Sequence, residues 1–139
     1  MAVYYVDTSV WRDHLESRED HLRPLGELAF QFLKQAMERR DTILYSELVL
    51  EELKLKYTSD EIERYCFEFL RDMRLIKEVK ISRKQVDEAG KIAGERKVPR
   101  GDALHAVLAR DNNATVVTRD RHFDSLQDIA KPLKPEEVT

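Results

Sequence analysis

Residues 3–9, VYYVDTS, and residues 115–120, TVVTRD, follow one pattern that decides the fold class. In each, a short run rich in β-branched or aromatic residues leads into hydroxyl-bearing residues and an aspartate. Such runs are typical of buried strands, and Asp, Thr and Ser are common where a helix or turn begins. The pattern predicts two buried strands, each with an acid at its carboxyl end: Asp7 and Asp120.

Between these two strands, amphipathic helices alternate with short apolar strands. Apolar residues recur at helical spacing over residues 25–37, and further strands are predicted at residues 42–45 and 76–81. Ser82 with Gln85 forms a capping box that starts another helix. This order predicts an α/β fold, a Rossmann-like sandwich with a central, mainly parallel sheet flanked by helices. Apolar and charged residues alternate in the strand at 76–81, which places it near a sheet edge.

The length of 139 residues fits a single hydrophobic core. We expect one domain over residues 1–130 and a loose C-terminal tail over residues 131–139, KPLKPEEVT. The single cysteine, Cys66, excludes an internal disulfide and suits a reducing compartment. No segment approaches the ~20 apolar residues of a membrane helix, and no basic leader opens the chain. We therefore expect a soluble, cytoplasmic protein without membrane association.

Two more acids are expected near the same edge of the sheet. Glu52 lies on the helix after the second strand, which Ser46 is placed to cap, and Asp102 begins the helix DALHAVLA. Glu52 shares a helical face with the apolar Leu48 and Val49, and a charge there needs a partner. Because ligands of open parallel sheets bind outside the carboxyl ends of the strands, these acids are candidate site residues.

Each acid also has a purely structural interpretation. Asp7 and Asp102 are good helix N-caps, Asp120 suits a turn, and Glu52 suits a solvated helix face. Together, however, clustered carboxylates raise one another's pKa unless a cation neutralises them. Oxygen ligands without Cys or paired His suit Mg²⁺ or Mn²⁺ better than zinc. The residues alone predict an acidic metal site, and they do not identify its substrate.

The segments VYYVDTSVW, SELVLEELK, GDALHAVLA and VVTRDRHF resemble, in this order, the four acidic motifs of PIN domains, especially those of VapC-type toxins of prokaryotes. The resemblance runs from about residue 3 to residue 124 and implies a PIN-like fold. It implies a metal-binding, catalytic quartet made of Asp7, Glu52, Asp102 and Asp120. It also implies that the hydroxyl groups of Ser9 and Thr118 assist the quartet.

The resemblance further implies a Mg²⁺- or Mn²⁺-dependent endoribonuclease that cleaves RNA. Such a protein is usually a homodimer and often the toxin of a toxin–antitoxin pair, silenced by a small antitoxin. Some relatives carry an acid where this chain has His122, so the fourth ligand position stays open between Asp120 alone and Asp120 assisted by His122 or Asp124. The alternatives are a non-catalytic metal- or RNA-binding PIN-like module and a phosphotransfer α/β protein.

The net charge of −3 neither supports nor excludes a nucleic-acid partner, so RNA binding needs a local basic rim. The candidate rim precedes or flanks two of the acids and consists of Lys97, Arg100, Arg119 and Arg121.

Several conspicuous side chains are assigned to packing rather than chemistry. His105 is interpreted as a packed, hydrogen-bonded histidine, and Trp11 and Cys66 as core residues. The apolar stripe that includes Phe67 and Leu70 is interpreted as core, with a homodimer face or antitoxin groove as the alternative.

Overall fold

Five parallel strands form one sheet in the structure, a computed structural model that describes residues 1–16 and 24–138. The strands are β1 (Val3–Val6), β2 (Thr42–Ser46), β3 (Ile76–Val79), β4 (Thr115–Val117) and β5 (Pro132–Leu133). The α-helices are α1 (Thr8–Glu16), α2 (Leu25–Arg39), α3 (Glu47–Lys54), α4 (Ser59–Ile62), α5 (Glu68–Asp72), α6 (Arg83–Arg96) and α7 (Arg100–Asp111). A π-helical turn η1 (Glu63–Phe67) and two 3₁₀ turns, η2 (Arg121–Leu126) and η3 (Pro135–Glu137), complete the elements.

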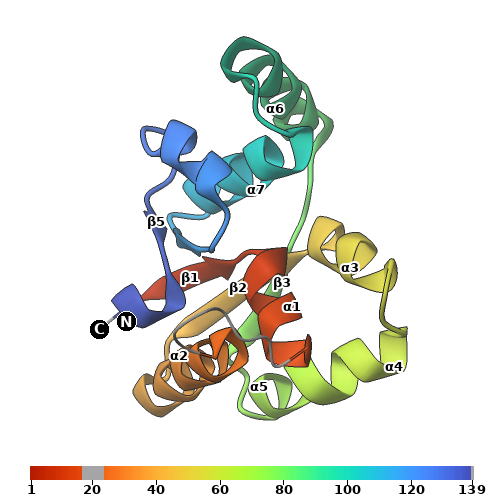
Figure 1. Ribbon diagram of the computed structural model, residues 1–139, viewed down its shortest axis with the longest axis vertical. Coiled ribbons are helices and arrows are strands. Elements are labelled where there is room, and N and C mark those ends of the chain that lie inside the picture. The colour runs from red at the N-terminus through yellow and green to blue at the C-terminus, as the bar shows by residue number, and fades with distance from the viewer. Residues whose placement is uncertain (17–23, 139) are drawn as a thin grey trace.

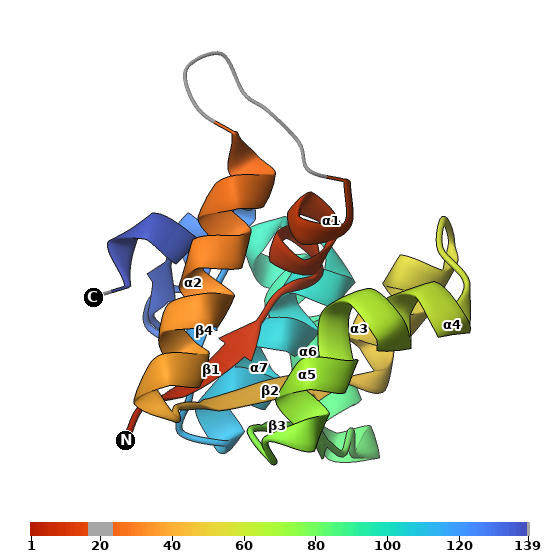
Figure 2. The same cartoon turned by 90° about the horizontal axis from the view of Figure 1, so that it is seen from below.

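Helices cover both faces of the sheet, as the alternating sequence pattern predicted. In Figure 1, α6 and α7 lie above the strands, while α2 and α5 lie below them. Figure 2 gives the same layering from below, with α2 and α5 in front of the strands and α7 behind. The predicted α/β sandwich is confirmed, and β3 lies at one edge of the sheet as expected. Among the described residues, no helix is long and apolar enough to cross a membrane.

The strand order β3-β2-β1-β4-β5 creates a switch point between β1 and β4. After β1 the chain builds the sheet outward through β2 and β3, and it then returns to add β4 on the other side of β1. In doubly wound sheets the crevice at such a point is where ligands bind. The backbone N–H of Asp7 donates to the carbonyl of Val117 at 2.9 Å, which ties the carboxyl ends of β1 and β4 together.

Aromatic packing anchors α1 and the η1 turn beneath this edge. Trp11 is fully buried, and its indole N–H donates to the Val6 carbonyl at 3.1 Å. The Phe67 ring lies 5.1 Å from that of Trp11 and 4.5 Å from that of Tyr45. Phe67 and Leu70 are core residues, as the favoured interpretation of the stripe predicted, whereas Tyr65, the first residue of that stripe, is 54% exposed. Burial raises the pKa of the Cys66 thiol to about 12, which keeps it protonated and inert.

The expected C-terminal tail is instead part of the fold. Residues 132–133 pair with β4, and the N–H groups of Val116 and Thr118 donate to the carbonyls of Lys131 and Leu133 at 3.0 and 2.9 Å. The η3 turn packs against α2, and Val138 is buried. The prediction of a loose segment was wrong for residues 131–138, because tertiary packing outweighs the loop-like composition of this stretch; residue 139 lies outside the described residues.

A chain that ends at Ala130 is expected to lose at least about 2 kcal/mol of unfolding free energy, since burying one Val or Leu side chain contributes about that much. Urea unfolding measured by circular dichroism tests this. Lys131→Gln, an exposed substitution that keeps the segment, is the control. An unchanged unfolding free energy after truncation would mean that the segment adds nothing to stability.

Candidate metal centre

Asp7 leaves β1 at the switch point and is almost fully buried, with 4% of its surface exposed. Its Oδ2 accepts hydrogen bonds from Ser9 Oγ at 2.7 Å and Thr118 Oγ1 at 2.9 Å. The two hydroxyl-bearing residues singled out in the sequence therefore both contact Asp7. Because they use Oδ2, the second oxygen, Oδ1, is left for another partner, and it lies 3.5 Å from His105 Nε2.

Glu52 projects from α3 toward Asp7. Its Oε1 accepts hydrogen bonds from Thr8 Oγ1 at 2.6 Å and His105 Nε2 at 2.8 Å. Burial alone would raise the pKa of Glu52, but the hydrogen bonds and charge from His105 and Thr8 lower it overall. A Cβ on Gly101 would lie 3.3 Å from Oε2, so the glycine leaves room for this carboxylate.

His105 links these acids to the interior through a buried chain of hydrogen bonds. Its Nδ1 lies 2.7 Å from Tyr5 Oη, which in turn lies 2.7 Å from Ser46 Oγ. A carboxylate only accepts, so the Nε2 that faces Glu52 carries the hydrogen. Burial would lower the pKa of His105, but Glu52 and the nearby acids raise it overall. His105 is thus packed and hydrogen-bonded, as predicted.

The role of Ser46 differs from the sequence-based expectation. It occupies the N-cap position of α3, yet its side chain makes no capping hydrogen bond. The hydroxyl contacts Tyr5 instead, because both side chains are fully buried and each needs a polar partner. The link from His105 to Glu52 was not foreseen, since it joins residues 53 positions apart.

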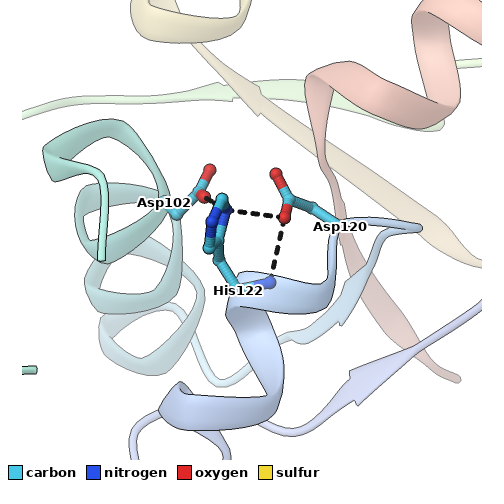
Figure 3. A group of neighbouring side chains, drawn as sticks. All are labelled: Asp102, Asp120 and His122. Carbon is cyan, nitrogen blue, oxygen red and sulfur yellow. Dashed lines mark hydrogen bonds and ion pairs between the residues drawn. The ribbon is translucent and has the colours of Figure 1, made fainter. Parts of the chain in front are cut away.

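Asp102 and Asp120 face each other across the crevice with His122 between them (Figure 3). Asp102 lies in the first turn of α7, and Asp120 caps η2 by accepting from the backbone N–H of His122 at 2.9 Å. The Nδ1 of His122 lies 2.8 Å from Asp120 Oδ1 and 3.0 Å from Asp102 Oδ2. Thr118 joins this pair to Asp7, because its Oγ1 also accepts from the Asp120 N–H at 3.0 Å.

The environment of Asp102 disfavours its charged form. Burial, followed by the charges of Asp120 and Asp7, raises its pKa to about 6. Its Oδ2 is buried and has no hydrogen-bond partner among the described residues, since the imidazole contact is not aligned as a hydrogen bond. A buried carboxylate oxygen without a donor is costly to ionise, and a cation beside it would offset that cost.

The donor set fits a divalent metal. Asp102, Asp120 and His122 each offer one ligand atom, and these atoms all lie within 4.8 Å of one another. Hydrogen bonds link Asp7 to Asp120 through Thr118, and His105 contacts both Asp7 and Glu52. The structure therefore brings all four sequence-predicted acids to one edge of the sheet. Asp124, by contrast, is exposed on η2 and outside this cluster of ligand atoms.

The predicted basic rim is only partly in place. Lys97 is the C-cap of α6, Arg100 begins α7 two residues before Asp102, and both side chains are exposed. Arg121 is exposed and lines a cleft of about 620 Å³ beside Asp120. The same cleft is lined by Lys131 and Lys134.

Arg119 lines the same cleft, but its guanidinium is paired with acids of the fold. Its guanidinium is 14% exposed and forms two hydrogen bonds with Glu136, at 3.0 and 2.6 Å, while Nε lies 3.4 Å from Asp13 Oδ2. These partners hold Arg119 in the fold, where it secures the C-terminal segment against the end of β4.

Comparisons with known proteins agree with this architecture. The family model described as PIN domain matches residues 4–129. A structure of VapBC2 from Rickettsia felis bound to a DNA fragment from their promoter has a similar chain, with a TM-score of 0.68, 18% identity, and coverage of 95% of this chain and 98% of that one. FitAcB from Neisseria gonorrhoeae has a TM-score of 0.65 and 19% identity, with coverage of 95% of this chain and 97% of that one. A toxin–antitoxin complex from Klebsiella pneumoniae has a TM-score of 0.59 and 20% identity, with coverage of 99% of this chain and 100% of that one. No curated protein matches the chain.

Asp102→Asn is expected to stabilise the metal-free protein at pH 7 by about 2 kcal/mol. The raised pKa means that the native state holds the Asp102 proton more tightly than the unfolded state, so stability is lost as pH rises from about 4 to about 6. An amide avoids this loss, and the difference should become small at pH 4.

Urea unfolding in EDTA at the two pH values measures this effect. Asp87→Asn, at an exposed position of α6, controls for the removal of one charge. A less stable Asp102→Asn protein at pH 7 would contradict the electrostatic account of this carboxylate.

Proposed function

Since the chain belongs to the PIN domain family, whose members are in general nucleases, we propose that it is a Mg²⁺- or Mn²⁺-dependent endoribonuclease that hydrolyses RNA phosphodiester bonds. The observation that carries this proposal is the gathering of Asp7, Glu52, Asp102 and Asp120 at the switch point of the sheet. In the proposal these four acids hold the metal. A non-catalytic metal- or RNA-binding module would use the same residues. Cleavage of RNA by the purified protein distinguishes the nuclease from this module.

A divalent ion bound at such a site would lower the pKa of a water molecule and neutralise charge on the phosphate. The chain's own contribution is preorganisation. Thr8 and His105 fix Oε1 of Glu52, and Ser9 and Thr118 fix Oδ2 of Asp7. Each of these carboxylates therefore presents its other oxygen in a set direction, which lowers the cost of assembling the ligand shell.

An RNA substrate is supported by the basic residues near the acids rather than by the whole-molecule charge. Arg100 begins α7 two residues before Asp102, Lys97 lies at the C-cap of α6, and Arg121 begins η2 next to Asp120. Lysine and arginine on both sides of a metal centre favour a phosphate backbone as the ligand that passes over it. Arg119 is left out of this set because Glu136 and Asp13 hold it.

The biological context in the proposal is that of a toxin. The similar chains above come from structures described as VapBC2, FitAcB and a toxin–antitoxin complex. These descriptions support a toxin with a small antitoxin as partner. The proposal further makes the protein a cytoplasmic homodimer. A short reading frame for a DNA-binding protein beside the gene would be consistent with this assignment.

Asp7→Asn and Asp102→Asn are each expected to lower Mn²⁺-dependent RNA cleavage by a hundredfold or more, because removing a ligand costs a few kcal/mol of transition-state stabilisation, roughly 3 kcal/mol. Single-turnover cleavage of a labelled single-stranded RNA measures the loss. Asp87→Asn is the matched control. Undiminished wild-type cleavage in EDTA would exclude the metal mechanism, and metal binding without cleavage of any tested RNA would favour the non-catalytic module.

Lys97→Glu combined with Arg100→Glu is expected to weaken RNA binding and to flatten its salt dependence, by roughly 0.7 in log–log slope for each phosphate that the variant no longer neutralises. Fluorescence anisotropy on an Asp7→Asn background measures binding without cleavage. Arg83→Glu with Lys84→Glu makes the same charge change at the opposite end of α6. Equal effects from the two pairs would mean that only net charge matters and that no rim exists.

A further inference from the structure

His122 directs a ring nitrogen into the acidic cluster although its side chain is 52% exposed. An imidazole this exposed is free to hydrate both of its nitrogens. Its Nδ1 instead lies 2.8 Å from Asp120 Oδ1 and 3.0 Å from Asp102 Oδ2, between the two side chains (Figure 3). The backbone supports this orientation, because the His122 N–H donates to the same Asp120 oxygen.

We propose that His122 is itself a metal ligand, and that its Nδ1 biases the site toward Mn²⁺ or another transition ion over Mg²⁺. This inference rests on the proposed metal site and adds a nitrogen to a set of oxygens. The buried Oδ2 of Asp102 is the second observation that supports it. That oxygen has no hydrogen-bond partner among the described residues, and it faces the position that His122 Nδ1 and Asp120 Oδ1 also approach.

The spacing of the three atoms suits a single ion. Neighbouring ligands of an octahedral ion with bonds of about 2.1 Å lie about 3.0 Å apart. The two distances from His122 Nδ1 match this value closely. The same distances also suit a protonated imidazole that serves as a counter-ion and leaves when a metal binds, so the decisive observation is whether nitrogen is bonded to the metal.

The nature of the donor sets the expected selectivity. Mg²⁺ takes oxygen ligands almost exclusively and dehydrates reluctantly, whereas imidazole nitrogen is a good ligand for transition ions. Replacing one oxygen donor by Nδ1 of His122 therefore lowers the affinity for Mg²⁺ more than the affinity for Mn²⁺. The other buried histidine, His105, has no such role, because both of its nitrogens are already used by Tyr5 and Glu52.

The test compares the full-length wild type with His122→Asp, which makes the donor set all-oxygen. Calorimetry measures the affinities for Mn²⁺ and Mg²⁺ separately, and pulsed electron paramagnetic resonance of the Mn²⁺-loaded protein detects coupling to a directly bound nitrogen. We expect that coupling in the wild type and its loss in His122→Asp. The preference for Mn²⁺ over Mg²⁺ should fall by about tenfold or more, the scale on which even indirect partners of a metal alter its affinity.

His14→Gln is the matched control, because His14 Nε2 lies 2.9 Å from the backbone oxygen of Tyr65, away from the cluster. This variant should keep both the nitrogen coupling and the Mn²⁺ preference. His122→Gln repeats the test without an added charge, and circular dichroism verifies that each variant folds.

Mn²⁺ binding without nitrogen coupling, and with the same ion preference in His122→Asp, would overturn the inference. His122 would then be a counter-ion, and the proposed nuclease would keep an all-carboxylate site. If neither ion binds the wild type, the proposed metal-dependent function fails together with the inference.

Discussion

Mutual repulsion among carboxylates held at one edge of a sheet is the constraint to which the rest of this structure responds. The parallel topology brings the ends of β1 and β4 together, and with them Asp7 and Asp120. Glu52 and Asp102 then arrive on helices that begin near the same edge. Such a concentration of negative charge is unfavourable in a folded core, so the surrounding residues act as donors that disperse it.

In Asp7 and Glu52, one carboxylate oxygen accepts two side-chain hydrogen bonds, and the other oxygen accepts none from these donors. Hydroxyl groups take Oδ2 of Asp7, and Thr8 with His105 takes Oε1 of Glu52. Burial and the charges of Asp120 and Asp7 raise the pKa of Asp102, which has no comparable donor to offset them, whereas the donors of Glu52 lower its pKa. In the proposed metal centre, a bound cation would restore the stability that this acid removes from the metal-free protein, so ligand affinity and folding would be linked through one carboxylate.

Local pattern was enough to predict most elements of this fold. Helical spacing located α2, and runs of β-branched residues located β1 and β4, because these signals depend on neighbours in the chain. Three of the acids were singled out because each follows a strand or begins a helix, and Glu52 because it shares a helical face with apolar residues. Contacts between distant residues had no such signal. The hydrogen bond from His105 to Glu52 and the pairing of Arg119 with Glu136 depend on how the sheet is assembled, and Lys131 to Glu137 have the composition of a loop although residues 132–133 form a strand.

The two outermost strands also limit how copies of this protein can meet. At one border, β3 turns the charged Lys77 and Glu78 outward; at the other, β5 is two residues long and begins with Pro132, which has no N–H to offer. Neither border is a good template for adding a strand from another molecule. Self-recognition in this chain is therefore expected to proceed through helical surfaces, because charges at one border and proline at the other disfavour edge-to-edge stacking into fibrils.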